Sequence, residues 1–443
     1  MVVPRSDEHM GEYVPASSER LKWLTGFTGS AGLAIIGGTS AALFVDGRYT
    51  LQAATQVDKG TFEVLQIPDS EPADWLIAKI RKGGVVGFDP RLHTGAWVAR
   101  TKQLLAKQGL RLKPLGLNPV DAVWGAERPA PPLGPVTVHA LKFAGKPAEQ
   151  KIIELQGTLK EGGEDAAILT LPDSIAWTFN IRGSDVHHNP TPLAFAILHA
   201  AGKPELFIDK RKLSADVRKY LNGICRLREP AELKERVGAL KKTGKRVRLD
   251  DTSAAFWLRQ QLGAASKLIS NATDPCILPK ARKNKAEAAG ARAAHERDGV
   301  AMAHFLAWLD REAPSGQVDE IKAVAQLESL RAQTQVLKEI SFDTISGSGA
   351  HGAIVHYRVT AATNRKLKPG ELFLVDSGGQ YEDGTTDVTR TIAIGSPTQE
   401  MRERFTLVLK GHIAISTLRF PKGTSGAHLD AFARHALWQQ GLD

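Results

Sequence analysis

The sequence predicts two similar α/β domains followed by a third domain of α+β character. Three observations support this: the chain has 443 residues, its composition is that of a globular protein, and two strand-like motifs recur in one register. At roughly 150 residues per domain, the length allows about three domains. Hydrophobic residues make up 42% and charged residues 24%, which is typical of folded proteins. We therefore expect three domains, at residues 1–145, 146–280 and 281–443.

The internal duplication predicts the first two domains. Leu43-Phe-Val-Asp46-Gly-Arg48 recurs in similar form as Leu206-Phe-Ile-Asp209-Lys-Arg211, and Val86-Gly-Phe-Asp89 recurs as Val247-Arg-Leu-Asp250. Each copy has an apolar run ending in Asp, then a helical stretch and a second such run, an alternation that indicates α/β units. A segment rich in Pro and Gly, residues 128–135, separates the copies. Chance similarity between apolar strands is the alternative interpretation.

The third domain is predicted to begin with helices. From residue 283 to 312 the composition turns to Ala, Arg, Glu and Leu without Pro. This stretch predicts a long amphipathic helix that buries Val300, His304, Leu306 and Trp308. The remaining expected elements are a helix at 318–340, strands at 353–356, 371–376 and 386–392, and helices at 399–418 and 426–440.

Charge and cysteine content limit the partners and the compartment. Lys plus Arg number 58 against 48 for Asp plus Glu, but the basic residues form short clusters without the interleaved aromatic residues of a strand-stacking surface. We therefore expect no nucleic-acid partner, although the excess of positive charge keeps nucleic-acid binding as a minor alternative. No apolar run approaches a membrane span of about 18 residues, and the N-terminus lacks the apolar core of a signal peptide. With only two cysteines and no C-x-x-C pair, the expected location is the cytoplasm.

Two acidic residues interrupt apolar patterns in the third domain. Asp376 ends the run Leu372-Phe-Leu-Val and precedes Ser-Gly-Gly, whereas Asp387 lies within Thr385-Thr-Asp-Val-Thr-Arg-Thr391. A carboxylate at the inner end of a buried strand is costly unless it is paired or binds a metal. One uninterrupted strand would place the two acids on opposite faces, but the glycines between them allow a bend that makes them converge.

Two convergent carboxylates suit a hard divalent cation such as Mn²⁺ or Mg²⁺. Thr389, on the strand face of Asp387, is a candidate hydrogen-bond partner. The alternative is a β-hairpin whose Asp residues only cap turns, because Asp383-Gly384 is an ordinary turn signal. His356, at the expected end of a strand, is a candidate proton shuttle or hydrogen-bond donor to a substrate carbonyl, and a structural histidine is the alternative.

Three motifs together resemble the Xaa-Pro aminopeptidases, or aminopeptidase P, of the pita-bread metallopeptidase family. They are Ile354-Val-His356-Tyr357, Val375-Asp-Ser-Gly-Gly-Gln-Tyr381 and Asp383-Gly-Thr-Thr-Asp-Val-Thr-Arg-Thr391. Residues 26–32, 45–49 and 175–185 are also similar to the longer, three-domain branch of that family. The resemblance implies two creatinase-like α/β domains before a pita-bread catalytic domain.

The resemblance also implies roles for four residues. Asp376 and Asp387 match two ligands of a dinuclear, usually manganese, centre; His356 matches a histidine that contacts substrate and stabilises the tetrahedral intermediate; Arg48 matches a substrate-contacting position. The implied activity is release of the first residue from a peptide with proline in second place, by a homodimer.

In the family, one His and two Glu complete the metal centre, and another His contacts the substrate. They lie in a segment that would follow Asp443. We therefore expect the C-terminal part of the catalytic domain to be missing and this chain alone to lack those ligands. A non-catalytic peptide-binding or dimerising protein on the same scaffold is the alternative function.

Overall fold

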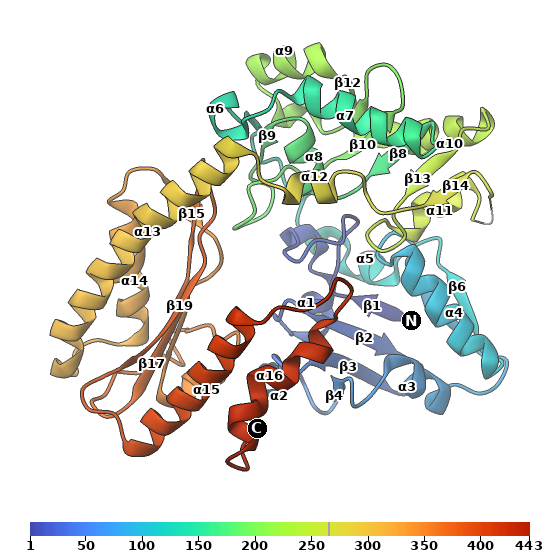
Figure 1. Cartoon of the computed structure of the whole chain (residues 1–443). Coiled ribbons are helices and arrows are strands. Elements are labelled where there is room, and N and C mark those ends of the chain that lie inside the picture. Colours follow the sequence, from blue (N-terminus) through green and yellow to red (C-terminus); the bar gives the residue numbers. More distant parts are fainter. Residues whose placement is uncertain (265) are drawn as a thin grey trace. The chain divides into compact units, whose positions relative to one another are not determined.

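The structure, a computed structural model, describes residues 1–264 and 266–443 (Figure 1). They form two compact units. The first comprises Met1–Glu296, Val336–Phe342 and Gly379–Thr386, and the second comprises Arg297–Gln335, Asp343–Gly378 and Asp387–Asp443. The two domain boundaries expected from the sequence, at residues 145 and 280, stay a prediction.

Two six-stranded sheets in the first unit have the same topology. The first contains β1 (Val2–Pro4), β2 (Gly32–Ile36), β3 (Ala41–Asp46), β4 (Glu63–Ile67), β5 (Val85–Phe88) and β6 (Arg111–Pro114). The second contains β8 (Ala166–Leu169), β10 (Phe195–His199), β11 (Glu205–Phe207), β12 (Arg226–Arg228), β13 (Val247–Leu249) and β14 (Ile269–Asn271). Their orders are β4-β3-β2-β1-β5-β6 and β12-β11-β10-β8-β13-β14.

The two sheets also share the direction of every strand pair. The central strands β1 and β8 each pair antiparallel with one neighbour and parallel with the other. Beyond the antiparallel neighbour, the pairs β2–β3 and β10–β11 are antiparallel and the pairs β3–β4 and β11–β12 are parallel. Beyond the parallel neighbour, the pairs β5–β6 and β13–β14 are parallel. The duplication that the sequence motifs predict is thus confirmed as a repeated fold.

Helices surround these sheets because the strands are apolar on both faces. Leu43 and Val45 of β3 belong to one core cluster, whereas Ala42 and Phe44 belong to another on the opposite face. The helices of the first repeat are α1 (Arg20–Thr25), α2 (Thr50–Gln56), α3 (Pro72–Lys79), α4 (Gly95–Lys107) and α5 (Pro119–Trp124). Those of the second are α7 (Ala148–Glu161), α8 (Pro172–Thr178), α9 (Ala215–Ile224), α10 (Leu233–Lys242), α11 (Phe256–Leu262) and α12 (Ile277–Ala281). Between the repeats are β7 (Thr137–Val138), which pairs with β9 (Ile181–Arg182), and α6 (Leu141–Ala144).

The remainder of the chain combines long helices with short strands. It contains α13 (Lys285–Glu312), α14 (Glu320–Ala332), β15 (Leu337–Ile340), β16 (Ile345–Ser348), β17 (Leu372–Ser377), β18 (Gly379–Tyr381), β19 (Val388–Ala393), α15 (Gln399–Thr417) and α16 (Gly426–Trp438). Strands β16, β17 and β19 form an antiparallel sheet, and β15 pairs with β18. The expected strands at 371–376 and 386–392 and the last two helices are confirmed.

Two expected elements are wrong. The helix expected at 318–340 ends at Ala332, because the chain turns at Gln335, whose φ is 58°, and continues as β15. Residues 353–356 form no strand. They follow a short 3-10 helix, η6 (Gly349–Ala353), and turn back through a hydrogen bond from Tyr357 N to Ile354 O.

Helix α13 exists as expected, but its buried stripe differs from the expected one. The buried positions in its second half include Asp298, Met302, Phe305 and Leu309. Their spacing is that of one helix face. Val300 and His304 are instead exposed. Leu306 and Trp308 are partly buried and pack against this core, so half of the expected residues are confirmed. The stripe also includes the charged residue Asp298, which pairs with Arg331 inside the core and which hydrophobicity alone could not indicate.

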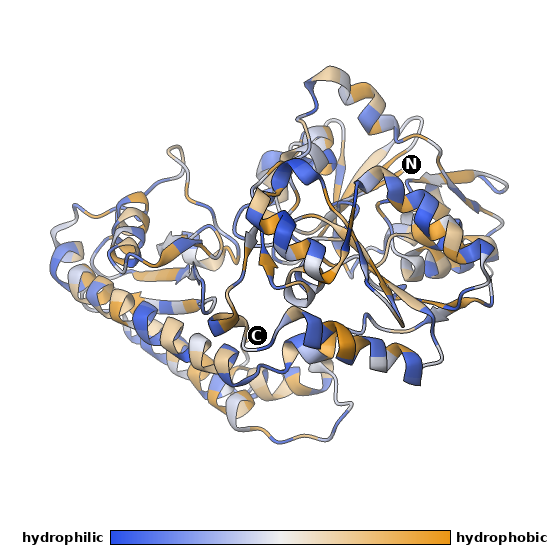
Figure 2. Ribbon diagram, turned by 90° about the horizontal axis from the view of Figure 1, so that it is seen from above, coloured by the Kyte–Doolittle hydropathy of each residue, from blue (hydrophilic) through white to orange (hydrophobic). Residues whose placement is uncertain are grey.

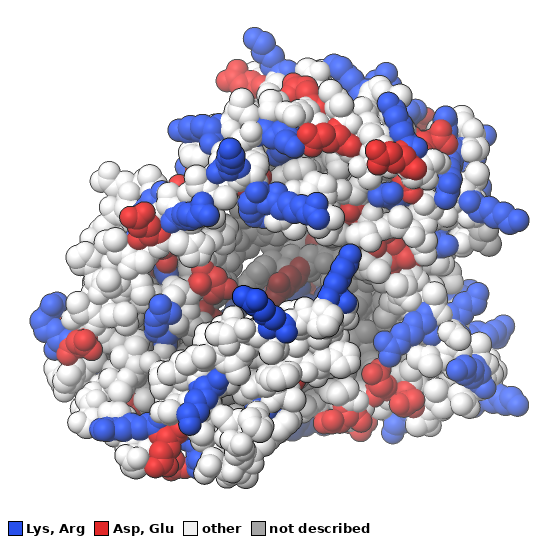
Figure 3. All heavy atoms as spheres, viewed as in Figure 1, with Lys and Arg blue, Asp and Glu red and all other residues white. Residues whose placement is uncertain are grey.

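The surface is mixed in character. In Figure 2, hydrophilic and hydrophobic residues alternate along the helices, as expected for helices that bury one face. On the face shown in Figure 3, Lys and Arg are interspersed with Asp and Glu. None of the helices in the described part of the chain has both the length and the apolar character of a membrane span.

Candidate active site

Asp376 and Asp387 lie on one face of the three-stranded sheet. Asp376 of β17 is paired with Thr389 of β19, and Asp387 immediately precedes β19, two residues before Thr389. Residues two apart along a strand share a face, so Asp387 lies diagonally across from Asp376. The chain reverses between the two acids, and this reversal makes them converge where one continuous strand would separate them.

This face of the sheet is the open one. Phe373, Val375 and Ser377 of β17 are buried on the opposite face, whereas Asp376 is half-buried and Asp387 is exposed. Neither carboxylate is fully buried at the inner end of a strand. Buried and partly exposed side chains alternate along β17. The carboxylates are on the solvated side of the sheet, which reduces the cost of desolvating them.

The two carboxylates interact with each other and with a hydroxyl. Thr389 Oγ1 donates a 2.8 Å hydrogen bond to Asp376 Oδ1, so the predicted partner contacts Asp376. Partial desolvation, the negative charge of Asp376 and a hydrogen bond to Asp376 raise the pKa of Asp387 above its ordinary value. Two like charges held this close are favourable only with a proton or a cation between them.

The donor set fits a hard divalent cation, because it consists of carboxylate oxygens with repelling charges and a hydroxyl that fixes one of them. The pair supplies two ligands only. Within residues 1–264 and 266–443, His, Cys, Asp and Glu side chains nowhere gather in a group of three or more that could hold a metal ion. Asp376 and Asp387 as metal ligands stay a prediction.

His356 lies in the connection between β16 and β17, three residues beyond the end of η6. The short helix η6 packs on both strands. A Cβ at Gly352 would lie 3.6 Å from the Cβ of Leu374, which is two residues before Asp376 and so on the same face. The short helix η6, which leads to His356, therefore packs beside Leu374 on the carboxylate face, and His356 is half-buried.

A buried carboxylate in this region had no signal in the sequence. Glu320 begins α14 and is fully buried, where it accepts hydrogen bonds from Ser348, His351, Tyr357 and Arg365. A glutamate in the first turn of a helix normally indicates only a favourable interaction with the helix dipole. Its partners are also distant in the sequence, so neither spacing nor composition could have identified the cluster.

Arg48 follows β3 and is bonded to the aspartate that ends that strand. Its Nε and Nη2 donate to the two carboxylate oxygens of Asp46 at 3.0 and 2.6 Å, and this contact raises the pKa of Arg48. In the second repeat, Arg211 and Asp209 have the same arrangement, with distances of 3.0 and 2.6 Å. Arg48 belongs to the first compact unit, and its contact with substrate stays a prediction.

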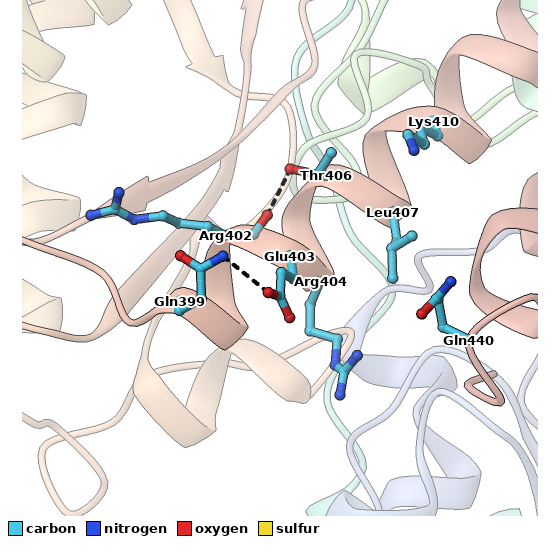
Figure 4. A pocket seen from close by; sticks show the side chains of 8 residues that line it. All are labelled: Gln399, Arg402, Glu403, Arg404, Thr406, Leu407, Lys410 and Gln440. Atoms are coloured by element: carbon cyan, nitrogen blue, oxygen red, sulfur yellow. Dashed lines mark hydrogen bonds between the residues drawn. The ribbon is translucent and has the colours of Figure 1, made fainter.

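A cavity of about 330 Å³ lies beside α15, and its lining does not include the two carboxylates (Figure 4). Its charged lining consists of Arg402, Glu403, Arg404 and Lys410. Glu403 accepts a 3.0 Å hydrogen bond from Gln399. None of the four predicted site residues lines it.

Comparison with known proteins shows similarity over the whole chain. The Creatinase/Prolidase N-terminal domain matches residues 9–118 and again residues 127–287, and metallopeptidase family M24 matches residues 289–443. The probable Xaa-Pro aminopeptidase P of Paracoccidioides lutzii is 39% identical over 457 residues, covering 100% of this chain and 74% of the relative. The probable Xaa-Pro aminopeptidase P of Neosartorya fischeri is also 39% identical, and 69% of its length is covered.

A solved structure agrees with these relatives. The X-prolyl aminopeptidase of Caenorhabditis elegans, described as a cytosolic enzyme with a di-nuclear active site, is 34% identical with a TM-score of 0.94. It matches 100% of this chain, which covers 73% of that structure. Both N-terminal domains and the metallopeptidase domain are thus present in the order that the repeated sheets and the carboxylate sheet suggest. The chain belongs to the Xaa-Pro aminopeptidase P group of metallopeptidase family M24.

Proposed function

We propose that this protein is a metal-dependent aminopeptidase that releases the first residue from peptides with proline in second place. The observation that carries the proposal is the convergence of Asp376 and Asp387 on one open sheet face. The 39% identity to probable Xaa-Pro aminopeptidases P supports the substrate class. A proline at that position lacks the amide hydrogen that other peptides offer, so discrimination rests on shape and on contacts to its carbonyl.

Asp376 and Asp387 would hold the metal, with Thr389 fixing the orientation of Asp376. The di-nuclear site of the nematode relative supports two ions, and we propose manganese as their identity. Bound divalent ions supply Lewis acidity for polarising a carbonyl and activating water. His356, which follows η6 on the carboxylate face, would donate a hydrogen bond to the substrate carbonyl oxygen as charge develops there. Arg48 would bind substrate.

The direct test is hydrolysis of Ala-Pro-Ala by the Mn²⁺-loaded protein, with Ala-Ala-Ala as the matched peptide. We expect release of alanine from the first peptide only, and we expect Asp376→Asn and Asp387→Asn to abolish it. Because the chain covers 69 to 74% of the length of these fungal relatives, the assay is made on the 443-residue chain and on the protein purified from its source. Failure of both to cleave Ala-Pro-Ala would refute the proposal.

A second candidate is a peptide-binding or dimerising protein without catalysis. It is favoured by one observation, that the carboxylate pair has no third metal-ligating partner among the described residues. Its distinguishing result is binding of Ala-Pro-Ala by the 443-residue chain without turnover at any Mn²⁺ concentration. A monomer in light scattering that binds no peptide would exclude this candidate.

The remaining assignments are part of the same proposal. Cytoplasmic location is supported by the nematode relative, described as cytosolic, and by two buried, unpaired cysteines, Cys225 and Cys276. A homodimer stays a prediction from the family resemblance. The domain boundaries at 145 and 280 are likewise proposed, supported by the end of one sheet at Pro114 and of the next at Asn271.

A further inference from the structure

The connection that contains His356 is long and mostly irregular. It runs from the end of β16 at Ser348 to the start of β17 at Leu372, and η6 is its only regular element. Connections of this length without regular structure are uncommon in compact domains, and functional ones need other contacts to order them. In this protein, many of those contacts are to a single side chain.

That side chain is the carboxylate of Glu320. Its Oε1 accepts hydrogen bonds from the backbone N of Ser348 and from His351 Nδ1, both at 2.8 Å. Its Oε2 accepts from Tyr357 Oη at 3.1 Å and from the backbone N of Arg365 at 3.2 Å. Both oxygens are therefore fully used, and Glu320 is 0% exposed. A buried carboxylate is tolerated in such a place only because four donors surround it.

The four donors bracket His356. Ser348 and His351 precede it, Tyr357 follows it directly, and Arg365 lies towards the far end of the connection. One rigid group on helix α14 thus fixes the chain on both sides of the histidine. The backbone of Glu320 adds two more contacts, from its own N to Arg365 O at 3.1 Å and from Ser346 Oγ to its O at 2.9 Å.

Contacts among the donors make the arrangement cooperative. The ring of His351 packs against that of Tyr357 with a centroid distance of 4.4 Å. Tyr357 Oη also lies 3.0 Å from Thr363 Oγ1, which in turn accepts from the backbone N of Thr360. Loss of the central carboxylate would leave several buried donors without acceptors at once.

We propose that Glu320 is a positioning residue for His356: its carboxylate holds the irregular connection in the conformation that presents this histidine above the carboxylate face. The catalytic role of His356 rests on the proposed function, whereas the placement of the connection by Glu320 does not. The Glu320→Gln substitution tests the placement of the connection and the catalytic role of His356. The amide nitrogen of glutamine cannot accept a hydrogen bond, so it would face a donor at two of the four contacts. Glu400→Gln is the matched control, since Glu400 lies in the first turn of α15 with a 74% exposed side chain.

The first measurement concerns placement alone. We expect Glu320→Gln to accelerate hydrogen–deuterium exchange at least about tenfold across 349–365 while exchange in α13 and α14 stays as in the unmodified protein. In protein labelled with ¹⁵N-histidine, with the His356 signal assigned through His356→Asn, Glu320→Gln should shift that signal, and Glu400→Gln should leave it in place. A lower Tm with an unmoved His356 signal would mean that Glu320 is merely structural and would overturn the proposal.

The second measurement concerns catalysis by the Mn²⁺-loaded protein on Ala-Pro-Ala. We expect Glu320→Gln to lower kcat by about tenfold to a hundredfold with little change in KM, because the histidine is misplaced and not removed. In the background of His356→Asn, Glu320→Gln should cause no further loss, and an additive loss would overturn the coupling. If neither the 443-residue chain nor the protein from its source cleaves Ala-Pro-Ala, the proposed function fails, while exchange and the histidine signal still decide the placement.

A less disruptive variant, Tyr357→Phe, tests the proposal if Glu320→Gln does not fold. Tyr357→Phe removes one of the four donors and keeps the ring that packs on His351. We expect it to shift the His356 signal and exchange in 349–365 in the same direction by a smaller amount. An unchanged signal in folded Tyr357→Phe, together with unchanged exchange, would also overturn the proposal.

Discussion

Thr389 lies directly opposite Asp376 across the β17–β19 pair, and its hydroxyl donates a 2.8 Å hydrogen bond to the Asp376 carboxylate. The bond uses one lone pair of Asp376 Oδ1. Thr389 therefore determines which way the carboxylate faces. Its contribution is orientation, since a threonine hydroxyl adds no charge to the pair.

Replacement of Thr389 by valine should weaken metal binding without removing a proposed ligand. Loss of the orienting hydroxyl typically reduces metal affinity by about tenfold to a hundredfold. We expect a reduction in that range for Mn²⁺, measured by titration calorimetry. Thr391→Val is the control, because Thr391 is two residues further along the same strand and is exposed. Equal Mn²⁺ affinity of Thr389→Val and the unmodified protein would show that the hydroxyl does not orient a metal ligand.

The charge of Asp387 should destabilise the protein when no metal is bound. Its pKa is raised in the folded state, so the folded protein binds more protons than the unfolded chain between 3.8 and the raised value. Stability from this group is therefore present at low pH and is lost as pH rises through that window. In EDTA at pH 7, Asp387→Asn should raise Tm by about 1–2 °C, and the difference should vanish at pH 3.

Bound Mn²⁺ should reverse the order of the Tm values of Asp387→Asn and the unmodified protein. With saturating Mn²⁺, the unmodified protein should gain more Tm than Asp387→Asn, because the cation binds the folded state through the charge that the variant lacks. The measurement is a thermal melt of both proteins with and without Mn²⁺. An equal Mn²⁺-dependent shift in the two proteins would contradict Asp387 as a ligand.

Much of the architecture was predictable because it depends on apolar periodicity. The Leu43 to Asp46 strand and its repeat at Leu206 to Asp209 identified a duplicated fold, and Asp376 with Asp387 identified the carboxylate pair. The turn around His356 was not predictable as such, because Ala353-Ile-Val has the composition of a strand and its conformation depends on distant contacts to Glu320. Polar residues inside the core, such as Asp298 and Glu320, do not follow the apolar periodicity of the sequence. Their burial can be recognised only when the partners that they contact in the fold are known.

The ion pair of Asp298 and Arg331 should be among the most sensitive contacts of the second unit. Arg331 Nε and Nη2 donate to the two oxygens of Asp298 at 2.8 and 3.0 Å, and the side chains of Arg331 and Asp298 are 0% and 3% exposed, respectively. Removing one charge leaves the other buried without compensation, so Asp298→Asn should cost about 3–5 kcal/mol of the free energy of unfolding. Urea titration measures this loss. Glu312→Gln, at an exposed pair with Arg311, is the control and should change stability by less than about 1 kcal/mol.

The repeated fold provides its own control for the role of Arg48. Arg48 with Asp46 and Arg211 with Asp209 have the same hydrogen-bond geometry at the end of equivalent strands, so the local effect of removing either arginine should be equal. Both pairs are at the surface, where salt bridges contribute little, and we expect Arg48→Ala and Arg211→Ala to leave Tm nearly unchanged. Only Arg48→Ala should raise KM for Ala-Pro-Ala, by about tenfold, because a charged hydrogen bond to substrate is lost. Equal KM values for the two variants would assign Arg48 the same purely structural role as Arg211.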